Sequence, residues 1–292
     1  MTRFRPFIVF FLIGFSSTSQ STAQTGGRPV PVDLALVLAV DVSGSVDEAE
    51  AALQRKGYVD AITDPRIVKA IGSGILGRIA VTYLEWAGDG WQTPVIDWTM
   101  IDGPASANAF AKKLSDAPIG GGPWTSISDA IDFSVALHET SPFEATRKVV
   151  DISGDGPNNT GGFVVHARDE AVAKRVTING LAIMNDRPNF GRVPMPNLDL
   201  YYRHCVIGGR GAFVIVANGF KDFAQAIRRK LILEIAGTLP AHNPYPEGDK
   251  IRAIGRAQTQ GKTAPSLRIG KDRWVPPCNE GERRFRGVID DE

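Results

Sequence analysis

The stretch "LALVLAVDVSGSVDEAE", residues 34–50, changes from apolar to acidic and hydroxyl-bearing within a few positions. Residues 34–40 are apolar without polar alternation, which predicts a strand buried on both faces. Asp41, Ser43 and Ser45 follow directly, and acids in the next positions favour a helix over 47–62. A carboxylate and two hydroxyls where a buried strand ends suit three chemistries: a phosphate cradle, an aspartyl nucleophile or a hard-metal site.

Strand-like and helix-like segments alternate along the rest of the chain. Strands separated by helices require crossover connections, which predicts an α/β fold with helices on both faces of the sheet. We expect a doubly wound, mostly parallel six-stranded sheet with one antiparallel edge strand, at 93–101. The other five strands are predicted at 34–40, 79–86, 148–152, 177–183 and 212–217. Further helices are predicted at 105–114, 128–138, 166–174 and 220–235.

The two ends of the chain differ from this central domain, predicted at 32–237. Residues 1–23 combine a basic start, a short apolar run and small residues, which is typical of a secretory signal peptide. The apolar run, 7–15, is shorter than the roughly 20 residues that span a bilayer, although an uncleaved anchor is the alternative. Residues 238–292 are rich in Pro, Gly and charge, so we expect an irregular C-terminal extension with at most one short strand. The mature protein is expected to be exported, periplasmic or secreted, with no membrane span.

Charge and cysteine content narrow the classes of partner. The chain has 33 basic and 32 acidic residues, so nothing in its charge favours nucleic acid as a partner. Its two cysteines, Cys205 and Cys278, are predicted to form a disulfide because an exported chain enters an oxidising compartment. The sequence has no CxxC motif and no Cys/His cluster, which disfavours zinc.

The polar residues with the strongest functional signal follow strands or precede a helix at one edge of the predicted sheet. In a doubly wound sheet, sites form beyond the carboxyl ends of the strands, where the strand order reverses. Carboxylate and hydroxyl oxygens in such a set are the ligands that Mg²⁺ prefers, with Mn²⁺ or Ca²⁺ also possible. The predicted ligands are Asp41, Ser43, Ser45, Thr125 and Asp155.

The competing chemistries lack residues that they need. A phosphate loop requires GxxxxGK[ST], and no lysine follows the glycines at 120–122. An aspartyl phosphotransferase of the haloacid-dehalogenase kind uses a second Asp two residues after the first, where this chain has Ser43. The GxSxG nucleophile motif is also absent from the sequence. The hard-metal site is therefore the favoured interpretation.

Three motifs carry a resemblance to a known family. DVSGS (41–45), GGGPWTS (120–126) and SGDGPNN (153–159) resemble the metal-binding loops of the von Willebrand factor type A (VWA) domain, over roughly 32–237. The resemblance implies a metal-ion-dependent adhesion site (MIDAS) formed by the five predicted ligands, with an open metal position that an Asp or Glu of a protein partner fills. The stretch RHCVIGGRGAFV (203–214), with SGDGPNN, also resembles an uncharacterised family of exported bacterial proteins with this domain.

The third motif departs from the family pattern. Family members usually have TDG where this chain has Gly154-Asp155-Gly156, so the supporting threonine is lost. Asp151 lies in the preceding strand, where we expect it to bond to neighbouring backbone or a hydroxyl in preference to the metal, because a buried Asp needs a partner.

The leading functional interpretation is an exported, metal-dependent protein-binding module. One alternative is a hydrolase that uses a Mg²⁺-bound water, which needs a general base, and Asp151 and Glu85 are the candidates. The other alternative is a scaffold whose metal is purely structural.

Aromatic and arginine side chains on loops at the same edge are the predicted partner contacts. Trp and Arg dominate binding energy at many interfaces, whereas the alternative is that loop aromatics pack under their own loops. The predicted contacts are Trp91, Trp124, Arg187, Phe190 and Arg192.

Overall fold

The computed structural model describes residues 28–185, 193–237, 267–269 and 273–289. The predicted signal peptide, residues 1–23, lies outside these ranges. Among the described residues, no helix combines the length and apolar character that a membrane crossing requires.

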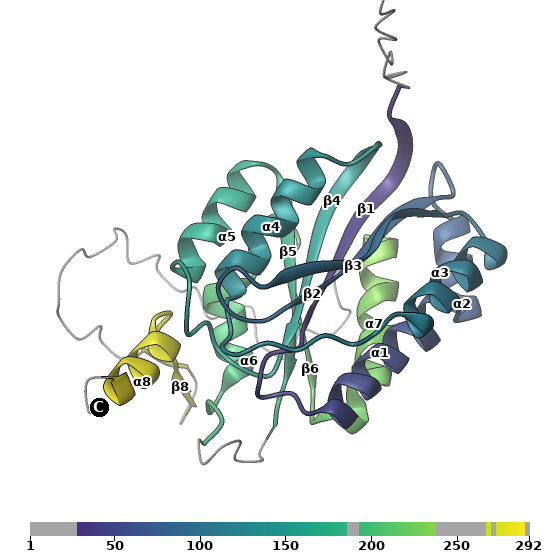
Figure 1. The fold of residues 1–292 in the computed structure, drawn as a ribbon. Coiled ribbons are helices and arrows are strands. Elements are labelled where there is room, and N and C mark those ends of the chain that lie inside the picture. The colour runs from purple at the N-terminus through teal and green to yellow at the C-terminus, as the bar shows by residue number, and fades with distance from the viewer. Residues whose placement is uncertain (1–27, 186–192, 238–266, 270–272, 290–292) are drawn as a thin grey trace, which may run out of the picture.

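A six-stranded sheet forms the centre of the molecule, with the strand order β3-β2-β1-β4-β5-β6 (Figure 1). Only β3 is antiparallel, pairing with β2 at the edge, while the other neighbours are parallel. This confirms the predicted sheet. The strands are β1 (Val30–Asp41), β2 (Ile79–Trp86), β3 (Gln92–Ile101), β4 (Phe143–Gly154), β5 (Val176–Ile183) and β6 (Val214–Ala217).

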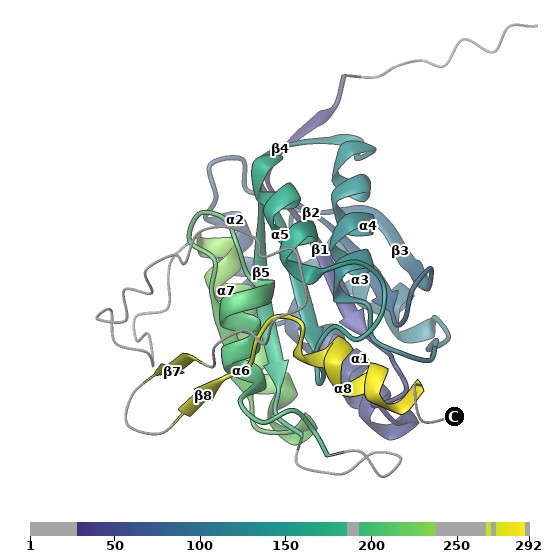
Figure 2. The same cartoon turned by 90° about the vertical axis from the view of Figure 1, so that its left-hand side faces the viewer.

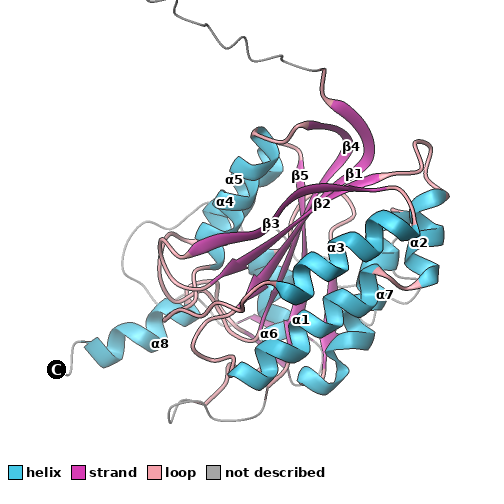
Figure 3. Cartoon of the chain, turned by 45° about the vertical axis from the view of Figure 1, so that its right-hand side comes forward, coloured by secondary structure: helices cyan, strands magenta, loops and turns pink. Residues whose placement is uncertain are grey.

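Helices cover both faces of the sheet, which Figure 3 shows as two cyan layers around magenta strands. The side chains of β1 alternate between the layers: Leu34, Leu36 and Leu38 pack in one core, and Val37 and Ala39 in the other. The first face carries α1 (Glu48–Ile62), α2 (Pro65–Gly72), α3 (Pro104–Asp116) and α7 (Phe223–Ala236). The second face carries α4 (Ile127–Glu139), α5 (Val164–Ala173) and the short α6 (Leu198–Tyr201).

The strand order reverses at β1, which lies between β2 and β4. The connection after β1 leads to β2 on one side of it, and the connection after β3 leads to β4 on its other side. A crevice is therefore expected beyond the carboxyl ends of β1 and β4. The chain segments at this end are the first loop (residues 42–47, after β1), the second loop (117–126, before α4) and the third loop (155–163, after β4). The topology therefore brings all three predicted motifs to one edge.

Local capping fixes where the helices beside these loops begin. Asp47 caps α1 by accepting from the Glu50 amide at 2.8 Å, and the Glu50 carboxylate accepts from the Asp47 amide at 3.1 Å. This reciprocal pair satisfies two amides at the helix start that would otherwise lack partners. Ser126 caps α4 by accepting from the Asp129 amide at 3.3 Å. Helix α1 thus begins directly after the first loop, and helix α4 directly after the second loop.

The C-terminal extension contains more regular structure than the sequence suggested. A two-stranded ribbon, β7 (Leu267–Ile269) with β8 (Arg273–Val275), precedes helix α8 (Glu280–Ile289). The predicted disulfide between Cys205 and Cys278 is confirmed, and it joins this segment to the turn that follows α6. Figure 2 shows the ribbon and α8 as the yellow elements, and α8 contacts the domain through Phe285 and Glu282.

Candidate metal centre

The first loop folds back on the carboxylate that ends β1. Asp41 is fully buried, and its Oδ1 accepts a hydrogen bond from the Ser43 amide at 2.7 Å. The Ser43 and Ser45 hydroxyls lie 3.1 Å apart. The Ser43 carbonyl accepts from the Val46 amide at 2.9 Å, which closes the turn before α1. The DxSxS spacing therefore places one carboxylate and two hydroxyls around a single tight turn.

The second loop brings Thr125 against this turn. The Thr125 hydroxyl donates to the Ser43 hydroxyl at 3.3 Å, and a parallel bridge pairs Ser43 with Gly122. Trp124, just before it, has φ of 64°, a backbone conformation that non-glycine residues rarely adopt. This kink redirects the chain from the glycine-rich segment into α4, and it leaves Thr125 facing the first loop.

The third loop supplies the second carboxylate. Asp155 follows the last residue of β4, and its Oδ1 accepts from the Ser45 hydroxyl at 2.5 Å. Hydrogen bonds thus connect Asp155 to Ser45, Ser45 to Ser43, and Ser43 to both Asp41 and Thr125. The structure brings all five predicted ligands into one cluster of oxygen atoms.

The electrostatics of the cluster fit a bound cation. Burial raises the pKa of Asp41 to about 8, with a further contribution from the charge of Asp155, and burial also raises the pKa of Asp155. Within the described ranges, no lysine or arginine pairs with either carboxylate. Asp41 Oδ2 is buried with no hydrogen-bond partner in the same part of the chain. Two buried like charges without a counter-ion are unstable unless a proton or a cation is bound.

The donor set also indicates the kind of cation. In the described part of the chain, no three His, Cys, Asp or Glu side chains group as they do in most zinc sites. The cluster instead combines two carboxylates with three hydroxyls. Hard oxygen donors of this kind fit Mg²⁺, Mn²⁺ or Ca²⁺, with solvent completing the coordination.

We predict that Mg²⁺ binding strengthens as the pH rises from 6 to 8. The cation requires ionised Asp41, whereas the metal-free site holds a proton below a pKa of about 8. With one proton displaced, the apparent affinity should rise roughly tenfold per pH unit in this window. Calorimetric titration with Mg²⁺ at pH 6, 7 and 8, in buffers of different ionisation enthalpy, measures both the affinity and the released proton.

The metal-free protein should show the opposite trend. Because the pKa of Asp41 is raised in the folded state, its contribution to stability is fully present below about pH 4 and is lost as the pH rises towards 8. Asp151 adds a trend of the same sign, but it is not a predicted ligand, so only Asp41 and Asp155 should link protons to metal binding. Equal Mg²⁺ affinities at pH 6 and pH 8 would contradict the assignment of Asp41 as a ligand.

Glu85, one of the two candidate general bases, is held in an ion pair. Its Oε1 pairs with the Arg55 guanidinium, and its Oε2 accepts from the Gly120 amide at 2.9 Å. Arg55 also donates to the carbonyls of Leu114 and Ala117, at 2.8 and 3.0 Å. Glu85 therefore fastens the start of the second loop to β2 and α1, a role that its position in a buried strand did not reveal.

Asp151, the other candidate base, pairs with a lysine instead of the expected backbone or hydroxyl partner. Its Oδ1 lies 2.5 Å from Lys230 Nζ, and Lys230 also contacts Glu234 Oε1 at 2.6 Å. Asn179 donates to the same Glu234 oxygen at 2.9 Å. The side chains of Asp151, Lys230 and Glu234 are fully or almost fully buried, and we call them the buried triad. Burial and the Glu234 charge raise the pKa of Asp151 to about 7, against the effect of Lys230.

Tyr202 is a residue at the site that sequence reasoning missed. A side-chain carbon at Gly154 would lie 2.7 Å from the Tyr202 hydroxyl and 2.8 Å from Asp41 Oδ2. The space that a threonine would need at this position, as in the TDG pattern, is thus filled by Tyr202, which enters from a π-helical turn (Tyr202–Val206). Burial raises the pKa of Tyr202 well above its usual value, with further contributions from Asp41 and Asp155. The glycine at position 154, where the family pattern has threonine, is the sequence signal that could have indicated a large side chain from elsewhere in this space.

The predicted partner contacts divide into two described residues and three others. Trp91 packs behind the second loop, where side-chain carbons at Gly120 and Gly122 would lie 2.6 and 3.2 Å from its ring. Trp124, next to the predicted ligand Thr125, is 43% exposed. Its ring meets that of Phe285 edge to face, with the ring centroids 5.7 Å apart. Arg187, Phe190 and Arg192 lie outside the described residues.

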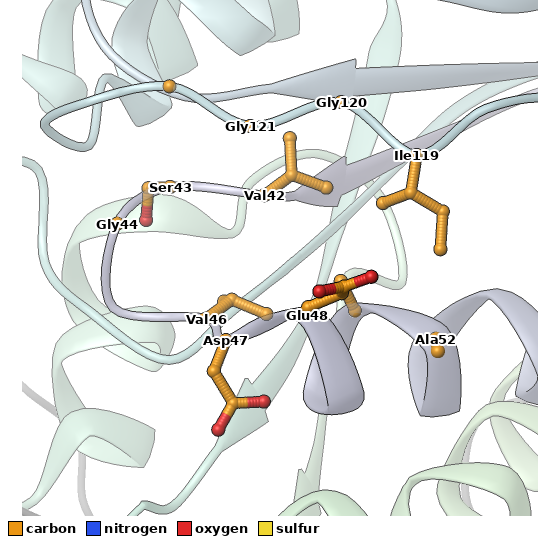
Figure 4. A pocket seen from close by; sticks show the side chains of 12 residues that line it. Val42, Ser43, Gly44, Val46, Asp47, Glu48, Ala52, Ile119, Gly120 and Gly121 are labelled. Carbon is orange, nitrogen blue, oxygen red and sulfur yellow. The ribbon is translucent and has the colours of Figure 1, made fainter.

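A cavity of about 640 Å³ adjoins the cluster, between the start of α1 and the second loop. Figure 4 shows the Ile119 side chain and the Glu48 carboxylate directed into this space. Ser43, a predicted ligand, lies in its wall, together with Val46. The cavity therefore opens beside the cluster of oxygen atoms, with aliphatic side chains in its lining and carboxylates at its margin.

The doubly wound sheet, with a DxSxS loop, a threonine and an aspartate gathered at its carboxyl edge, has the fold seen in VWA-type proteins. Its fold is similar to that of a pilus adhesin, SpaC, from Lactobacillus rhamnosus GG, with 14% identity, a TM-score of 0.51 and coverage of 70% of this chain and 30% of that one. Proximal thread matrix protein 1 from the mussel byssus, solved with a zinc-occupied MIDAS motif, has 13% identity and a TM-score of 0.50, with coverage of 71% of this chain and 49% of that one. A von Willebrand factor type A protein from Catenulispora acidiphila has 11% identity and a TM-score of 0.48, with coverage of 70% and 43%. The chain thus spans less than half the length of these three relatives.

The chain belongs to the DUF1194 family, described as "Protein of unknown function", which it matches over residues 31–239. The match covers the sheet and both helical layers, and it ends just after α7. The comparison with curated proteins finds no match to this chain.

Proposed function

We propose that this protein is an exported, metal-dependent protein-binding module whose Mg²⁺ site is completed by an Asp or Glu of its partner. The observation that carries the proposal is the cluster of five oxygen-bearing side chains at the carboxyl edge of the sheet, in which two buried carboxylates lack a counter-ion within the described ranges. Export is supported by the Cys205–Cys278 disulfide, since such bonds persist in oxidising compartments.

The five predicted ligands would contribute to cation binding in two different ways. Asp41 and Asp155 supply negative charge, while the hydroxyls of Ser43, Ser45 and Thr125 complete the protein side of the shell, directly or through water. A cation held there would supply the charge that a carboxylate of the partner could bind. The two buried carboxylates would hold the cation beside the first loop, and the exposed Trp124 belongs to the adjacent second loop.

The cavity next to the cluster supports recognition of several neighbouring residues of the partner, in addition to its carboxylate. A partner residue that neighbours the metal-binding acid could place an aliphatic side chain between Val46 and Ile119. Burying apolar surface there would add affinity, at roughly 25 cal/mol per Å². Specificity would then depend on the metal and the cavity together.

The hydrolase alternative receives less support from the same site. Both carboxylates that could act as its general base are committed to cationic partners, Glu85 to Arg55 and Asp151 to Lys230. A general base must reach the proton that it removes, and its protonation state must be free to change. A metal-dependent turnover in a phosphatase and esterase screen would favour this alternative over a binding module.

We predict that partner capture from an extract of exported proteins requires both the metal and the partner's carboxylates. Immobilised protein should retain its partner in Mg²⁺ and lose it in chelator, because the proposed contact passes through the cation. Asp155→Asn should lose capture, whereas Asp116→Asn, which removes an exposed carboxylate of α3, should retain it. Amidating the carboxylates of the captured partner with a carbodiimide and an amine should also abolish rebinding.

Each outcome separates the candidate functions. Capture that survives chelator and Asp155→Asn alike would show that the partner docks elsewhere and that any metal is structural. Capture that needs the metal but survives amidation would overturn the role of the partner's carboxylate.

A further inference from the structure

Helix α8 of the C-terminal extension lies at the rim of the metal centre. Figures 1 and 2 both place it at the lower end of the domain. Its contacts there are with residues next to the predicted ligands: Phe285 meets the ring of Trp124, and Glu282 Oε1 accepts from Asn158 Nδ2 at 2.9 Å. The extension thus contacts both the second and the third loop.

A glycine allows the closest of these approaches. A side-chain carbon at Gly281 would lie 1.9 Å from the carbonyl oxygen of Asn158, a distance at which one of the two segments must move. Gly281 is also the second residue of α8, where glycine is a poor helix former. The absence of a side chain at this position therefore lets the helix dock directly on the third loop.

Asn158 connects this contact to the start of α4. It is fully buried, and its Oδ1 accepts from the Ser128 amide in the first turn of α4 at 2.9 Å. Its Nδ2 also lies within 3.1 Å of the carbonyls of Thr160 and Gly162, which shapes the third loop around it. The side chain that α8 touches is therefore the one that joins the third loop to α4.

The third loop also holds the backbone of Thr125. The Thr125 amide donates to Asn159 Oδ1, and the Thr125 carbonyl accepts from the Asn159 amide, both at 2.8 Å. Thr125 is the only predicted ligand on the second loop. Its position relative to Ser43 and Asp155 consequently depends on how the third loop is held.

We infer that α8 acts as a clamp that sets the metal affinity of this site, with Gly281 and Glu282 as positioning residues that act through Asn158. The inference rests on the proposed metal site and extends it to a segment beyond the region that matches the family. Residues that orient metal ligands typically change metal affinity by about 10- to 100-fold when they are replaced.

Replacing Gly281 with alanine tests the clamp. The added methyl group collides with the Asn158 carbonyl, so α8 must move away, and we expect Mg²⁺ to bind roughly tenfold more weakly. Alanine forms helices better than glycine, so a weaker helix cannot explain such a loss. Gly72→Ala is the matched control: it also lies in a helix, and its side-chain carbon would meet nothing within 4 Å. Calorimetric titration with Mg²⁺ and thermal melting without metal are measured for each variant.

Substitutions at Glu282 separate positioning from general stability. Glu282→Gln keeps an oxygen that can accept from Asn158 Nδ2 and should retain wild-type Mg²⁺ affinity, whereas Glu282→Ala should weaken it as Gly281→Ala does. If Gly281→Ala and Glu282→Ala lower the melting temperature but leave the Mg²⁺ affinity unchanged, α8 only fastens the structure and the inference is wrong. If the wild-type protein binds no Mg²⁺, the proposed metal site itself is overturned and the inference with it.

Discussion

Replacing Asp41 with alanine is expected to abolish the stabilisation of the protein by Mg²⁺. Asp41 is the charged predicted ligand at the end of β1, and its loss leaves Asp155 as the one carboxylate of the cluster. A cation at 100 times its dissociation constant stabilises a folded protein by about 2.7 kcal/mol. In a domain of this size that corresponds to a rise of roughly 5–10 °C in the melting temperature, which the variant should lack.

In the absence of metal, the loss of the Asp41 charge should cost little stability, whereas Asp41→Ala also removes the acceptor of the Ser43 amide. Asp41 is buried beside a second carboxylate, which is why the pKa of Asp41 is raised, so its charge does not favour the metal-free fold. Asp41→Asn keeps the shape of the side chain and provides the conservative comparison, while Asp116→Ala controls for the loss of one negative charge. Melting curves with Mg²⁺ and with chelator test all four proteins. Equal stabilisation of the wild type and Asp41→Ala would exclude Asp41 as a ligand.

Removing the disulfide should have the largest effect on stability. Cys205 and Cys278 are 73 positions apart, and closing a loop of that length restricts the unfolded chain by about 4 kcal/mol in the entropic treatment. The double variant Cys205→Ala/Cys278→Ala should therefore unfold at a clearly lower denaturant concentration. Alanine is preferred to serine because Cys205 is fully buried and a hydroxyl there would need a hydrogen-bond partner.

Reduction provides the matched control for this prediction. A thiol reductant should shift the wild-type denaturation curve towards that of the double variant and leave the variant unchanged. Mass spectrometry of the non-reduced protein should detect the two linked peptides. Two alkylatable thiols in the exported wild-type protein, or identical unfolding midpoints, would contradict a stabilising role for the bond.

Much of the fold could be predicted because its signals are local and strong. Residues 34–40 are apolar throughout and form the buried centre of the sheet, as expected for a strand covered on both faces. Helix α2 was missed although Asp64 and Pro65 form a recognisable start, with Asp64 accepting from the Arg66 amide at 2.9 Å. Its eight residues gave too short a pattern to be noticed.

The five predicted ligands could be named because strand ends converge at one edge of a doubly wound sheet. What surrounds them could not be named, since those contacts join segments far apart in the sequence. Tyr202 reaches Gly154 from an irregular turn, and α8, which follows the disulfide, reaches Asn158 from the C-terminal extension. Lys230 occupies a buried position of α7, and its partner, Asp151, lies on a different element. The periodicity of apolar residues within one segment cannot predict contacts between segments that are far apart in the sequence.

The buried triad has a consequence for how α7 finds its place on the sheet. Lys230 lies between carboxylates from β4 and from its own helix, in a layer that consists mainly of aliphatic and aromatic side chains. A slip of α7 by one helical turn would carry Lys230 and Glu234 together about 5.4 Å along the sheet and would leave Asp151 buried without its cation. An unpaired buried charge costs several kcal/mol, whereas apolar side chains tolerate such shifts at far smaller cost. The ion pair thus selects a single docking register for the last helix of the domain, even where it adds little to the free energy of unfolding.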